Sequence, residues 1–528
     1  MNVRPGRLPA RKTAAPQRSY QSYSFPGPSL GWVSDQNLAM GQPGAAYRLD
    51  NIFPTQTGGV LRRGQSLRAT LGSAVRSLFA YEQGATRRLF AATDADVWDI
   101  TIGDAPVSGH SITNGLLSVA KYVNTDGILY VRGVNGDDTP WLYDGTSFDT
   151  TPALTFPSGD ATTPEDLKFV WVYENRFFFI KKESLDIYYL PVAAIGGTLT
   201  KFSLGGLVKE GGHLVFGATW SQNTGSGFSS MCVMVTDQGE AVVFQGRNPG
   251  DANDWDRVGV YAIGKPLGPN AFAQRGGDLA ICTDIGLIAL SQALVQNAES
   301  LSPTAMSRPI EPDWSRYVGE RSSAGWSMTA WTEGQMLAVA LPTASGQTPV
   351  WLVSNATTGK WGRFTGWNAS CLCTFNGELY YGSPAGKVHQ ANVTGVDDGL
   401  PYTGIYVPAF DPIGVMGRKA VHMARATLRS RFAIKEKLSV HADYQVQLPP
   451  SPSAAPVPSA DVWGVAVWGT ATWGGASSKG DVKSVWCNTF GEGEAVTVAL
   501  QVTSGSIAPL DTEFIRTDLL FTAGEPQS

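Results

Sequence analysis

The feature that most constrains the fold is a strand–turn–strand pattern that recurs seven times between residues 89 and 390. Each unit has an apolar run, a few turn residues such as Asp-Gln-Gly or Pro-Ala-Gly, and a second apolar run, which predicts a β-hairpin. The matched positions are Leu89, Leu129, Phe177, Cys232, Leu279, Leu337 and Leu379, so the gaps are 40, 48, 55, 47, 58 and 42 residues. A period of about 40–50 residues with several strands per unit is typical of a β-propeller.

We therefore expect an all-β fold whose main part is a β-propeller-like domain of about seven hairpin or blade units. The alternative is a string of hairpins in two or three sandwiches, but sandwich strands need not keep a period. The composition agrees with a β fold: 60 glycines and 32 prolines suit many turns, and 22 Phe, 17 Tyr and 16 Trp suit strands. No continuous apolar run approaches the roughly 20 residues that a membrane helix needs, so we expect no membrane segment.

The pattern divides the chain into three parts. We expect an extended N-terminal arm over residues 1–57, the propeller-like domain over 58–410 and a C-terminal β domain over 411–528. The arm lacks the apolar core of a secretory signal and has little periodicity, so it is expected to be anchored on a partner and dispensable for folding. The C-terminal domain contains the linker "QLPPSPSAAPVPSADV", which is too rich in Pro and Ser to pack as a core.

Charge and cysteine usage exclude several classes of protein. The net charge is −5, so the chain as a whole is not a basic nucleic-acid binder. The five cysteines form no CxxC pair and the five histidines are dispersed, so we expect no disulfide framework, no metal site and no cofactor. The first 34 residues are locally basic and contain no acid, with cations at Arg4, Arg7, Arg11, Lys12 and Arg18.

One stretch rich in Asp and Asn, "FQGRNPGDANDWDRVGV", raises the question of a calcium loop. An EF-hand loop needs oxygen ligands at alternate positions and a glycine at the sixth position. Counted from Asp251, the third and fifth positions are Asn253 and Trp255 and the sixth is Asp256, so the pattern fails. Because Asn, Asp, Pro and Gly also build consecutive turns, we interpret the segment as a loop between two strands, held in place by Trp255.

No sequence pattern points to catalysis. Paired carboxylates for glycoside hydrolysis could come from Asp94/Asp96, Asp137/Asp138 or Asp251/Asp254/Asp256, but all of these lie in turn contexts. The sequence has no G-x-S-x-G, HExxH or P-loop motif. We therefore expect that the protein is not an enzyme and that it has no catalytic residues.

A basic stripe is predicted in "HMARATLRSRFAIKEKL". If this segment is one strand, its odd positions place all the cations on one side and its apolar residues on the other. Such a stripe is either a solvated strand face or a surface that meets phosphates or an acidic neighbouring subunit. The candidate interface or DNA-channel residues are Arg425, Arg429, Arg431, Lys435 and Lys437.

A tryptophan triplet marks the C-terminal region. Trp463, Trp468 and Trp473 stand five residues apart in "VWGVAVWGTATWGG", so successive rings cannot share one face of a strand. Each Trp-Gly pair more plausibly opens a tight turn, which predicts a folded tongue. The tongue is either packed in a core or an exposed aromatic element, and the sequence leaves both readings open.

Several stretches resemble tail structural proteins of tailed bacteriophages, most of all the nozzle (tail tubular) proteins of short-tailed phages. They are "RLDNIFPTQTGGVLRRG", "FQGRNPGDANDWDRVGVYAIGKPLG" followed by "GGDLAICTDIGLIALS", and the Trp-Gly triplet before "GEGEAVTVAL". The similarity spans most of residues 45–528 as scattered motifs. Such proteins are all-β, contain a propeller-like domain and form a hexameric ring below the portal and adaptor.

This resemblance implies a virion structural protein that is made in the host cytoplasm and continues the DNA-ejection channel. Its implied partners are further copies of itself in a homohexameric ring, the phage portal and adaptor proteins, tail fibres and, transiently, double-stranded DNA. One alternative is a receptor- or carbohydrate-binding propeller of the tail, with or without hydrolytic activity. Another is a propeller scaffold of the host cell.

Overall fold

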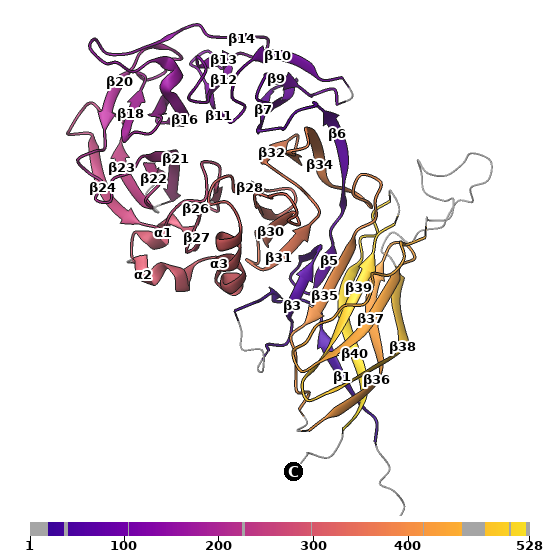
Figure 1. The fold of residues 1–528 in the computed structure, drawn as a ribbon. Coiled ribbons are helices and arrows are strands. Elements are labelled where there is room, and N and C mark those ends of the chain that lie inside the picture. The colour runs from indigo at the N-terminus through magenta and orange to yellow at the C-terminus, as the bar shows by residue number, and fades with distance from the viewer. Residues whose placement is uncertain are drawn as a thin grey trace, which may run out of the picture.

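The computed structural model describes residues 19–35, 41–103, 105–223, 228–296, 298–414, 417–456, 481–505 and 508–523. Within this part of the chain, seven sheets stand around a central axis like blades, and the C-terminal strands form a second body at the rim of the ring (Figure 1). The fold is therefore all-β with a β-propeller, as the hairpin period predicted. The first strand of a blade packs against the first strand of the next one around much of the ring.

The first four blades each contain four antiparallel strands. They are β7–β10 (Ser77–Gln83, Thr86–Ala92, Asp96–Asp99, Val107–Ser111), β11–β14 (Ser118–Val123, Leu129–Val134, Trp141–Tyr143, Phe148–Asp149), β16, β17, β18 and β20 (Leu167–Tyr173, Arg176–Lys181, Asp186–Tyr189, Thr200–Ser203), and β21–β24 (Leu214–Asn223, Phe228–Thr236, Glu240–Gly246, Trp255–Ala262). Between the second and fourth of these lie the short parallel pair β15 (Leu154–Thr155) and β19 (Gly197–Thr198) and the 3-10 turn η2 (Pro164–Asp166).

The fifth blade has three strands, and helices follow it. Its strands are β25–β27 (Phe272–Arg275, Asp278–Thr283, Gly286–Ala289), and the helical elements are α1 (Leu290–Ala293), α2 (Ala298–Leu301), η3 (Ser302–Thr304), η4 (Arg308–Ile310) and α3 (Glu311–Glu320). In α3 the indole of Trp314 is buried and donates a hydrogen bond to the carbonyl of Thr283 at 3.0 Å, which fixes the helix on the blade. The helices explain why the longest gap in the sequence pattern, 58 residues, falls here.

The ring is closed by a strand from the other end of the domain. The sixth blade is β28–β31 (Ser327–Trp331, Met336–Ala340, Val350–Asn355, Trp361–Thr365), and the seventh begins with β32–β34 (Cys371–Phe375, Glu378–Gly382, Lys387–Thr394). Strand β6 (Gly64–Thr70) pairs antiparallel with β34 and supplies the fourth strand of the seventh blade. Because the first and last parts of the propeller share one sheet, the ring cannot open without breaking that pairing.

The second body is a sandwich of two sheets. Sheet A has the order β38-β36-β40-β5-β4, and β1 also pairs with β40; sheet B continues from β31 through β3, β35 and β39 to β37. Sheet A contains β1 (Gln21–Pro26), β4 (Ile52–Pro54), β5 (Gly59–Leu61), β36 (Lys419–Ser430), β38 (Asp481–Gly493) and β40 (Glu513–Ala523). The sandwich strands of sheet B are β3 (Ala45–Asp50), β35 (Thr403–Pro408), β37 (Lys435–Ala442) and β39 (Val496–Thr503), and β2 (Gly31–Trp32) pairs with β3.

The described part of the region expected to be an extended N-terminal arm contributes strands to this sandwich. Between residues 19 and 57 the structure places β1, β2, β3 and β4, and the side chains of Phe25, Trp32 and Leu49 are buried. These strands were missed because β1 and β2 are short and have no alternating apolar partner nearby in sequence. Their partners, β40 in particular, lie almost 500 residues away.

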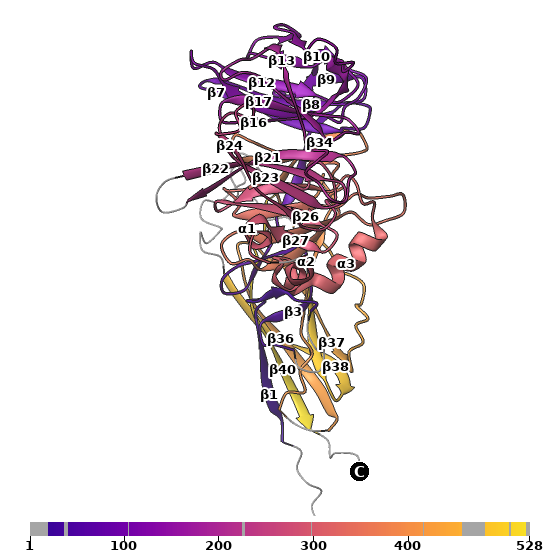
Figure 2. The same ribbon diagram turned by 90° about the vertical axis from the view of Figure 1, so that its left-hand side faces the viewer.

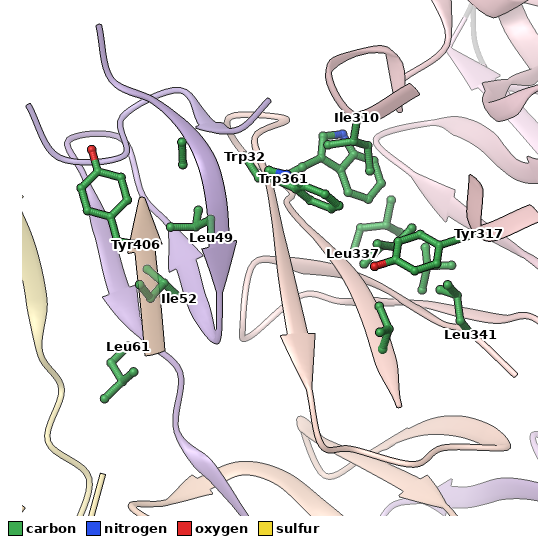
Figure 3. Packing of buried hydrophobic residues seen from close by; sticks show 14 of the residues in the cluster. Trp32, Leu49, Ile52, Leu61, Ile310, Tyr317, Leu337, Leu341, Trp361 and Tyr406 are labelled. Atoms are coloured by element: carbon green, nitrogen blue, oxygen red, sulfur yellow. The ribbon is translucent and has the colours of Figure 1, made fainter. Parts of the chain in front are cut away.

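One hydrophobic core runs from the propeller into the sandwich. Figure 3 shows Trp361, Leu337 and Ile310 of the propeller on one side, with Leu49, Ile52 and Tyr406 of the sandwich on the other and Trp32 between them. The indole of Trp361 donates to the carbonyl of Met306 at 2.9 Å, so its orientation is set as well as its burial. Because buried apolar contacts are continuous, the two bodies form a single rigid piece.

The two views place the sandwich relative to the ring. Figure 1 looks along the propeller axis, and in Figure 2, turned by 90°, the ring is seen from its edge while the sandwich still extends away below it. The sandwich is therefore attached at the rim and does not continue the central axis of the propeller.

Candidate interaction surface

The segment rich in Asp and Asn is the loop between β23 and β24, as the sequence predicted. Gly246 and Trp255 pair where the two strands meet the loop. The carbonyl of Asp251 accepts hydrogen bonds from the backbone N–H groups of Asp254 and Trp255 at 3.0 Å each, and its Oδ1 accepts one from Asn253 at 2.9 Å. Trp255 is buried and stacks on Phe244 with ring centroids 5.0 Å apart. The acidic and amide groups therefore shape the turn.

The other carboxylates singled out in the sequence connect neighbouring parts of the ring. Asp94 accepts two hydrogen bonds from Arg76, which lower its pKa. Burial alone would raise the pKa of Asp138, but hydrogen bonds from Thr113, from Asn114 and from Asn135 outweigh burial and lower it. Both groups are ionised hydrogen-bond acceptors, whereas a general acid in glycoside hydrolysis needs a raised pKa.

The basic stripe is not one continuous strand. Strand β36 ends at Ser430 and β37 begins at Lys435, so Arg425 and Arg429 lie on sheet A whereas Lys435 and Lys437 lie on sheet B. The single strand assumed in the sequence analysis is therefore wrong, because the chain turns between residues 431 and 434 and crosses to the opposite sheet.

The two arginines of β36 already have acidic partners on β40. The guanidinium of Arg425 lies 2.7 Å from Asp518, whose carboxylate is almost fully buried, and stacks 4.7 Å above the ring of Trp486. Arg429 lies 3.0 Å from the half-buried Glu513. Arg431 is exposed in the turn, Lys435 is exposed at the start of β37, and the ammonium of Lys437 donates to the carbonyl of Pro450 at 3.1 Å. The outer face of sheet A is consequently a mixed, largely neutralised surface.

The predicted tongue lies outside the described residues. Trp463, Trp468 and Trp473 belong to residues 457–480, for which the structure gives no placement. The hypothesis of a folded or exposed tongue therefore stays a prediction.

A buried arginine holds the propeller and the sandwich together. The side chain of Arg62, which precedes β6, is fully buried and makes a two-pronged ion pair with Asp397, with contacts of 3.0 and 2.7 Å. Its remaining N–H groups donate to Asn51 and to the carbonyls of Arg63 and Thr365. The rings of Trp367 and Tyr402 lie 4.4 and 4.0 Å from the guanidinium carbon.

A second charged network lies at the same junction. The carboxylate of Asp50 in β3 is nearly fully buried and forms ion pairs with Arg363 of β31 and with Arg48, each at 2.6 Å. Arg363 also donates to the hydroxyl of Tyr317 in α3 at 3.1 Å. A cavity of about 480 Å³ adjoins these groups. The network connects β3, β31 and α3, so it fixes the sandwich relative to the sixth blade.

Strand β38 is a long edge strand of the described structure. It is thirteen residues long, it ends the order of sheet A, and among the described residues its outer edge has no pairing partner. Val482, Val485 and Phe490 on this strand are exposed by 59%, 55% and 75%. A long edge strand with exposed apolar side chains is a template for pairing with another chain.

Beside β38 lies an open groove. It has a volume of about 550 Å³ and runs between β38 and β37, which ends sheet B on the same side of the sandwich. Its lining includes Leu438, Val440 and Ala442 of β37 and Thr489 and Phe490 of β38. The two strands still touch beside the groove, where Lys483 of β38 pairs with Glu436 of β37 at 2.5 Å.

The sequence analysis did not predict this edge, which lies in "SVWCNTFGEGEAVTVALQV". The sequence offered one signal. Strands β38 and β39 follow each other closely, but Val485 and Phe490 do not continue the pattern of apolar residues in β39, which is buried throughout. Consecutive strands usually pair, yet β38 belongs to sheet A and β39 to sheet B. Which edge stays uncovered depends on that switch between sheets.

Two further findings concern the described part of the chain. It contains no cluster of three or more His, Cys, Asp or Glu side chains arranged to hold a metal ion. Its helices are all too short, or too polar, to cross a lipid bilayer.

Burial raises the pKa of the Cys232, Cys371 and Cys373 thiols to about 12 in each case, so these three groups are protonated at neutral pH.

Together, the closed ring of blades and the joined sandwich define a β-propeller protein with an open-edged β-sandwich at its rim. No protein-family model matches the chain, and no curated protein matches it significantly. Among solved structures, similar folds include BBS1N in complex with ARL6DN (12% identity, 63% of this chain and 96% of that chain, TM-score 0.38). Chaetomium thermophilum Raptor matches at 11% identity over 63% of this chain and 29% of its own, with a TM-score of 0.39. The Cps50 (Swd1) β-propeller domain of Myceliophteria thermophila matches at 10% identity over 62% and 100%, with a TM-score of 0.37.

Proposed function

We propose that this protein is a structural component of a short-tailed bacteriophage virion, forming the ring, or nozzle, that continues the DNA-ejection channel below the portal and adaptor. The observation that carries the proposal is the role of residues 48–64, the first of the stretches that resemble nozzle proteins. This stretch contains Asp50, Asn51 and Arg62, which make buried or partly buried contacts at the junction of propeller and sandwich. One of the stretches behind the resemblance thus supplies contacts that join the two bodies.

A rigid piece with one uncovered side suits a subunit of a ring. The propeller pairs its own first and last strands, so the ring of blades is closed within one chain. Among the described residues the sandwich at the rim has a long edge strand, β38, and the proposal places the contacts between copies there. In this arrangement the channel is the hole between six copies of the chain, and the propellers lie around it. The portal or adaptor above and tail fibres below are the proposed partners.

The charge distribution is compatible with a passage for DNA. The net charge is −5, and the arginines of β36 are paired with Asp518 and Glu513. A strongly basic lumen would hold the phosphate backbone by releasing its counterions, and this would slow ejection. Double-stranded DNA is therefore a transient partner in the proposal, without a fixed binding site.

The proposal assigns no enzymatic activity to the chain. Its support is the state of the candidate carboxylates: Asp94 and Asp138 have lowered pKa values and hold neighbouring segments by hydrogen bonds. The test is an assay for hydrolysis of peptidoglycan and capsule polysaccharide by the purified protein. Reproducible hydrolysis that Asp94→Ala or Asp138→Ala abolishes while the melting temperature stays near that of the wild type would contradict this part of the proposal.

The ring is tested by imaging. We expect sixfold density of this protein in purified particles, between the adaptor and the tail tip, and light scattering of the isolated protein gives its mass before assembly. Absence of the protein from the particle would refute the proposed function. Single fibres at the tail rim, together with binding on a glycan array, would instead support a receptor- or carbohydrate-binding protein.

A further inference from the structure

We propose that copies of this chain join head to tail by strand pairing, with β1 of one copy adding to the free edge of β38 of the next. The proposal deepens the proposed ring by naming the surface through which its copies touch. Its starting point is that sheet A ends at β38 on one side, whereas β1 pairs only with β40 on the other, among the described residues. Each copy thus has two unpaired strand edges in one sheet.

The strand directions of the two edges are compatible. Strand β38 is antiparallel to β36, β36 is antiparallel to β40, and β40 is antiparallel to β1. Across the sheet, β38 and β40 therefore run one way, and β36 and β1 run the other way. When one sheet A continues into the next, β1 meets β38 as an antiparallel neighbour, which is the pairing that sheets accept most readily.

The register within sheet A predicts which residues meet. Ser22 lies in line with Leu520, which pairs with Met423, which pairs with Asn488. By the same rows, Phe25 lies in line with Val485 through Thr517 and Ala426. A straight continuation of the sheet therefore places Ser22 opposite Asn488 of the next copy, and Phe25 opposite Val485.

The faces of the two strands also match in this register. Phe25 points into the sandwich, where it belongs to the core cluster with Val421 and Leu519. Val485 pairs across from Ala426, a buried core residue of β36, so it faces the same side of sheet A. In the isolated chain Val485 is 55% exposed, and a neighbouring β1 would cover it with apolar surface. Strand addition of this kind supplies main-chain hydrogen bonds as well as apolar contact.

Charges at the ends of the two strands are complementary. In the register across sheet A, Gln21 of β1 lies in line with Gly491 of β38. The start of β1 is therefore level with the end of β38. Glu492, Glu494 and Asp443 are exposed at that end, and Arg418, which contacts Glu492, and Lys419, which lies near Glu494 and Asp443, offset part of their charge. The sequence that leads into β1, residues 1–18, contains five cations and no acid. Opposite charge between the two edges favours the head-to-tail contact over pairing of like edges.

This contact has a consequence for assembly. Because β1 and β38 are different surfaces, the interface is heterologous, and heterologous contacts form a ring when the rotation between copies closes. A stable contact buries on the order of 1,200 Å² or more in total, so strand pairing must be accompanied by further contacts between the two copies.

The test is a pair of engineered cysteines in the full-length chain, with Cys487→Ser to remove the partly exposed native thiol beside them. Ser22→Cys and Asn488→Cys are combined in one chain, and both positions are exposed. We expect oxidation of purified particles, or of the concentrated protein, to give a ladder of linked chains on non-reducing gels. Each single cysteine variant is the matched control and should stay monomeric, because in a head-to-tail contact a residue never meets its own copy.

A second variant tests the contact without a crosslink. Val485→Lys should weaken association by about tenfold or more, because it removes one buried apolar contact and adds an edge-strand lysine. Val192→Lys, at a propeller loop position that is 54% exposed, is the control and should associate normally. Both variants should keep the wild-type melting temperature, because neither side chain is buried in the isolated chain.

The outcomes separate this inference from the proposed function. Rings in the particle without crosslinks in the double-cysteine variant, and with normal assembly of Val485→Lys, would overturn the β1–β38 contact but leave the nozzle in place. If the isolated protein forms crosslinked ladders but is absent from the particle, the β1–β38 contact is supported and the proposed nozzle function is refuted.

Discussion

The propeller and the sandwich treat their strand edges in opposite ways. In the propeller the last blade is completed by β6, so strands from the two ends of the domain share one sheet and close the ring. In the sandwich β38 and β37 end their sheets on the same side with a groove between them, and Val485 and Phe490 are exposed there. The comparison teaches that the propeller uses strand pairing to close its own ring, whereas the sandwich leaves the edge of β38 available for pairing with a partner.

The two regions are nevertheless tied by unusually well-buried charges. Arg62 meets Asp397 in the interior, and Asp50 meets Arg363 close by. Such pairs are expensive to bury and strongly destabilising to break, so they specify one arrangement of the two bodies.

Removal of β1 and β2 should have the largest effect and should destabilise the sandwich more than the propeller. A chain that begins at Ala46 loses the buried Phe25 and Trp32, each worth about 3–5 kcal/mol when truncated, against a typical total stability of about 5–15 kcal/mol. We expect the C-terminal strands to become sensitive to protease while a propeller fragment survives. Limited proteolysis with mass spectrometry measures this.

The control for that truncation is a chain that begins at Ser19, which keeps β1 and should melt as the full-length protein does. If the chain that begins at Ala46 also melts at the wild-type temperature and resists protease, β1 and β2 are not part of the folding unit. The idea of a dispensable arm, which the sequence favoured, would then hold.

Asp397→Ala should have the next largest effect, because it leaves the fully buried Arg62 without its counterion. The expected loss in the free energy of unfolding is about 3–5 kcal/mol. Asp94→Ala is the matched control, since its partner Arg76 and its own carboxylate are each nearly half exposed, and we expect a loss of about 1 kcal/mol or less. Urea unfolding of both variants gives the difference, and equal losses would show that the junction is no more strongly held than the propeller surface.

The two arginines of β36 should differ in the same sense on a smaller scale. Arg425→Gln removes the partner of the buried Asp518, and we expect a loss of about 1–3 kcal/mol in sandwich stability. Arg429→Gln removes an exposed pair with Glu513 and should cost about 0.2–1 kcal/mol. Thermal melts followed by circular dichroism compare them. A larger effect for Arg429→Gln would mean that solvent exposure does not determine how much each ion pair contributes to stability.

The smallest expected effect is a loss of sandwich stability in alkali. Burial, together with the hydrogen bond to Asp411, raises the pKa of Tyr23 to about 12, against an ordinary value of 10.0. The folded protein therefore keeps this proton more tightly than the unfolded chain, and the stabilisation is complete below pH 10 and is lost as the pH rises to about 12. Stability measured from pH 9 to 12 should fall less steeply for Tyr23→Phe. Identical slopes for both proteins would contradict the assignment to Tyr23.

Much of the propeller could be predicted from sequence because its signals are local. Each hairpin joins two apolar runs through a few turn residues, so "MCVMVTDQGEAVVF" by itself indicates β22 and β23. The turn reading of Asp251 and its neighbours followed from the same kind of local chemistry. The helices after the fifth blade were not predicted, although the 58-residue gap marked their position.

The interaction surface was predicted only in part. Arg425 and Arg429 were correctly placed side by side on one strand face, but their acidic partners lie about 90 residues further along the chain. The switch of the chain from sheet A to sheet B between Arg431 and Lys435 has no strong turn signal in "SRFAIKEK". Val485 became a candidate only when the structure left it uncovered.

The sequence by itself determined the strand content, the hairpin repeat and the turns, because period-two alternation and turn residues act over fewer than ten residues. Only the tertiary structure decided that Gly64–Thr70 closes the seventh blade, that β1 completes sheet A beside β40, and that β38 stays uncovered. A strand carries the same alternation whichever strand it pairs with. Its partner is chosen by which apolar faces can be buried together once the whole chain has folded, and these partners lie hundreds of residues apart.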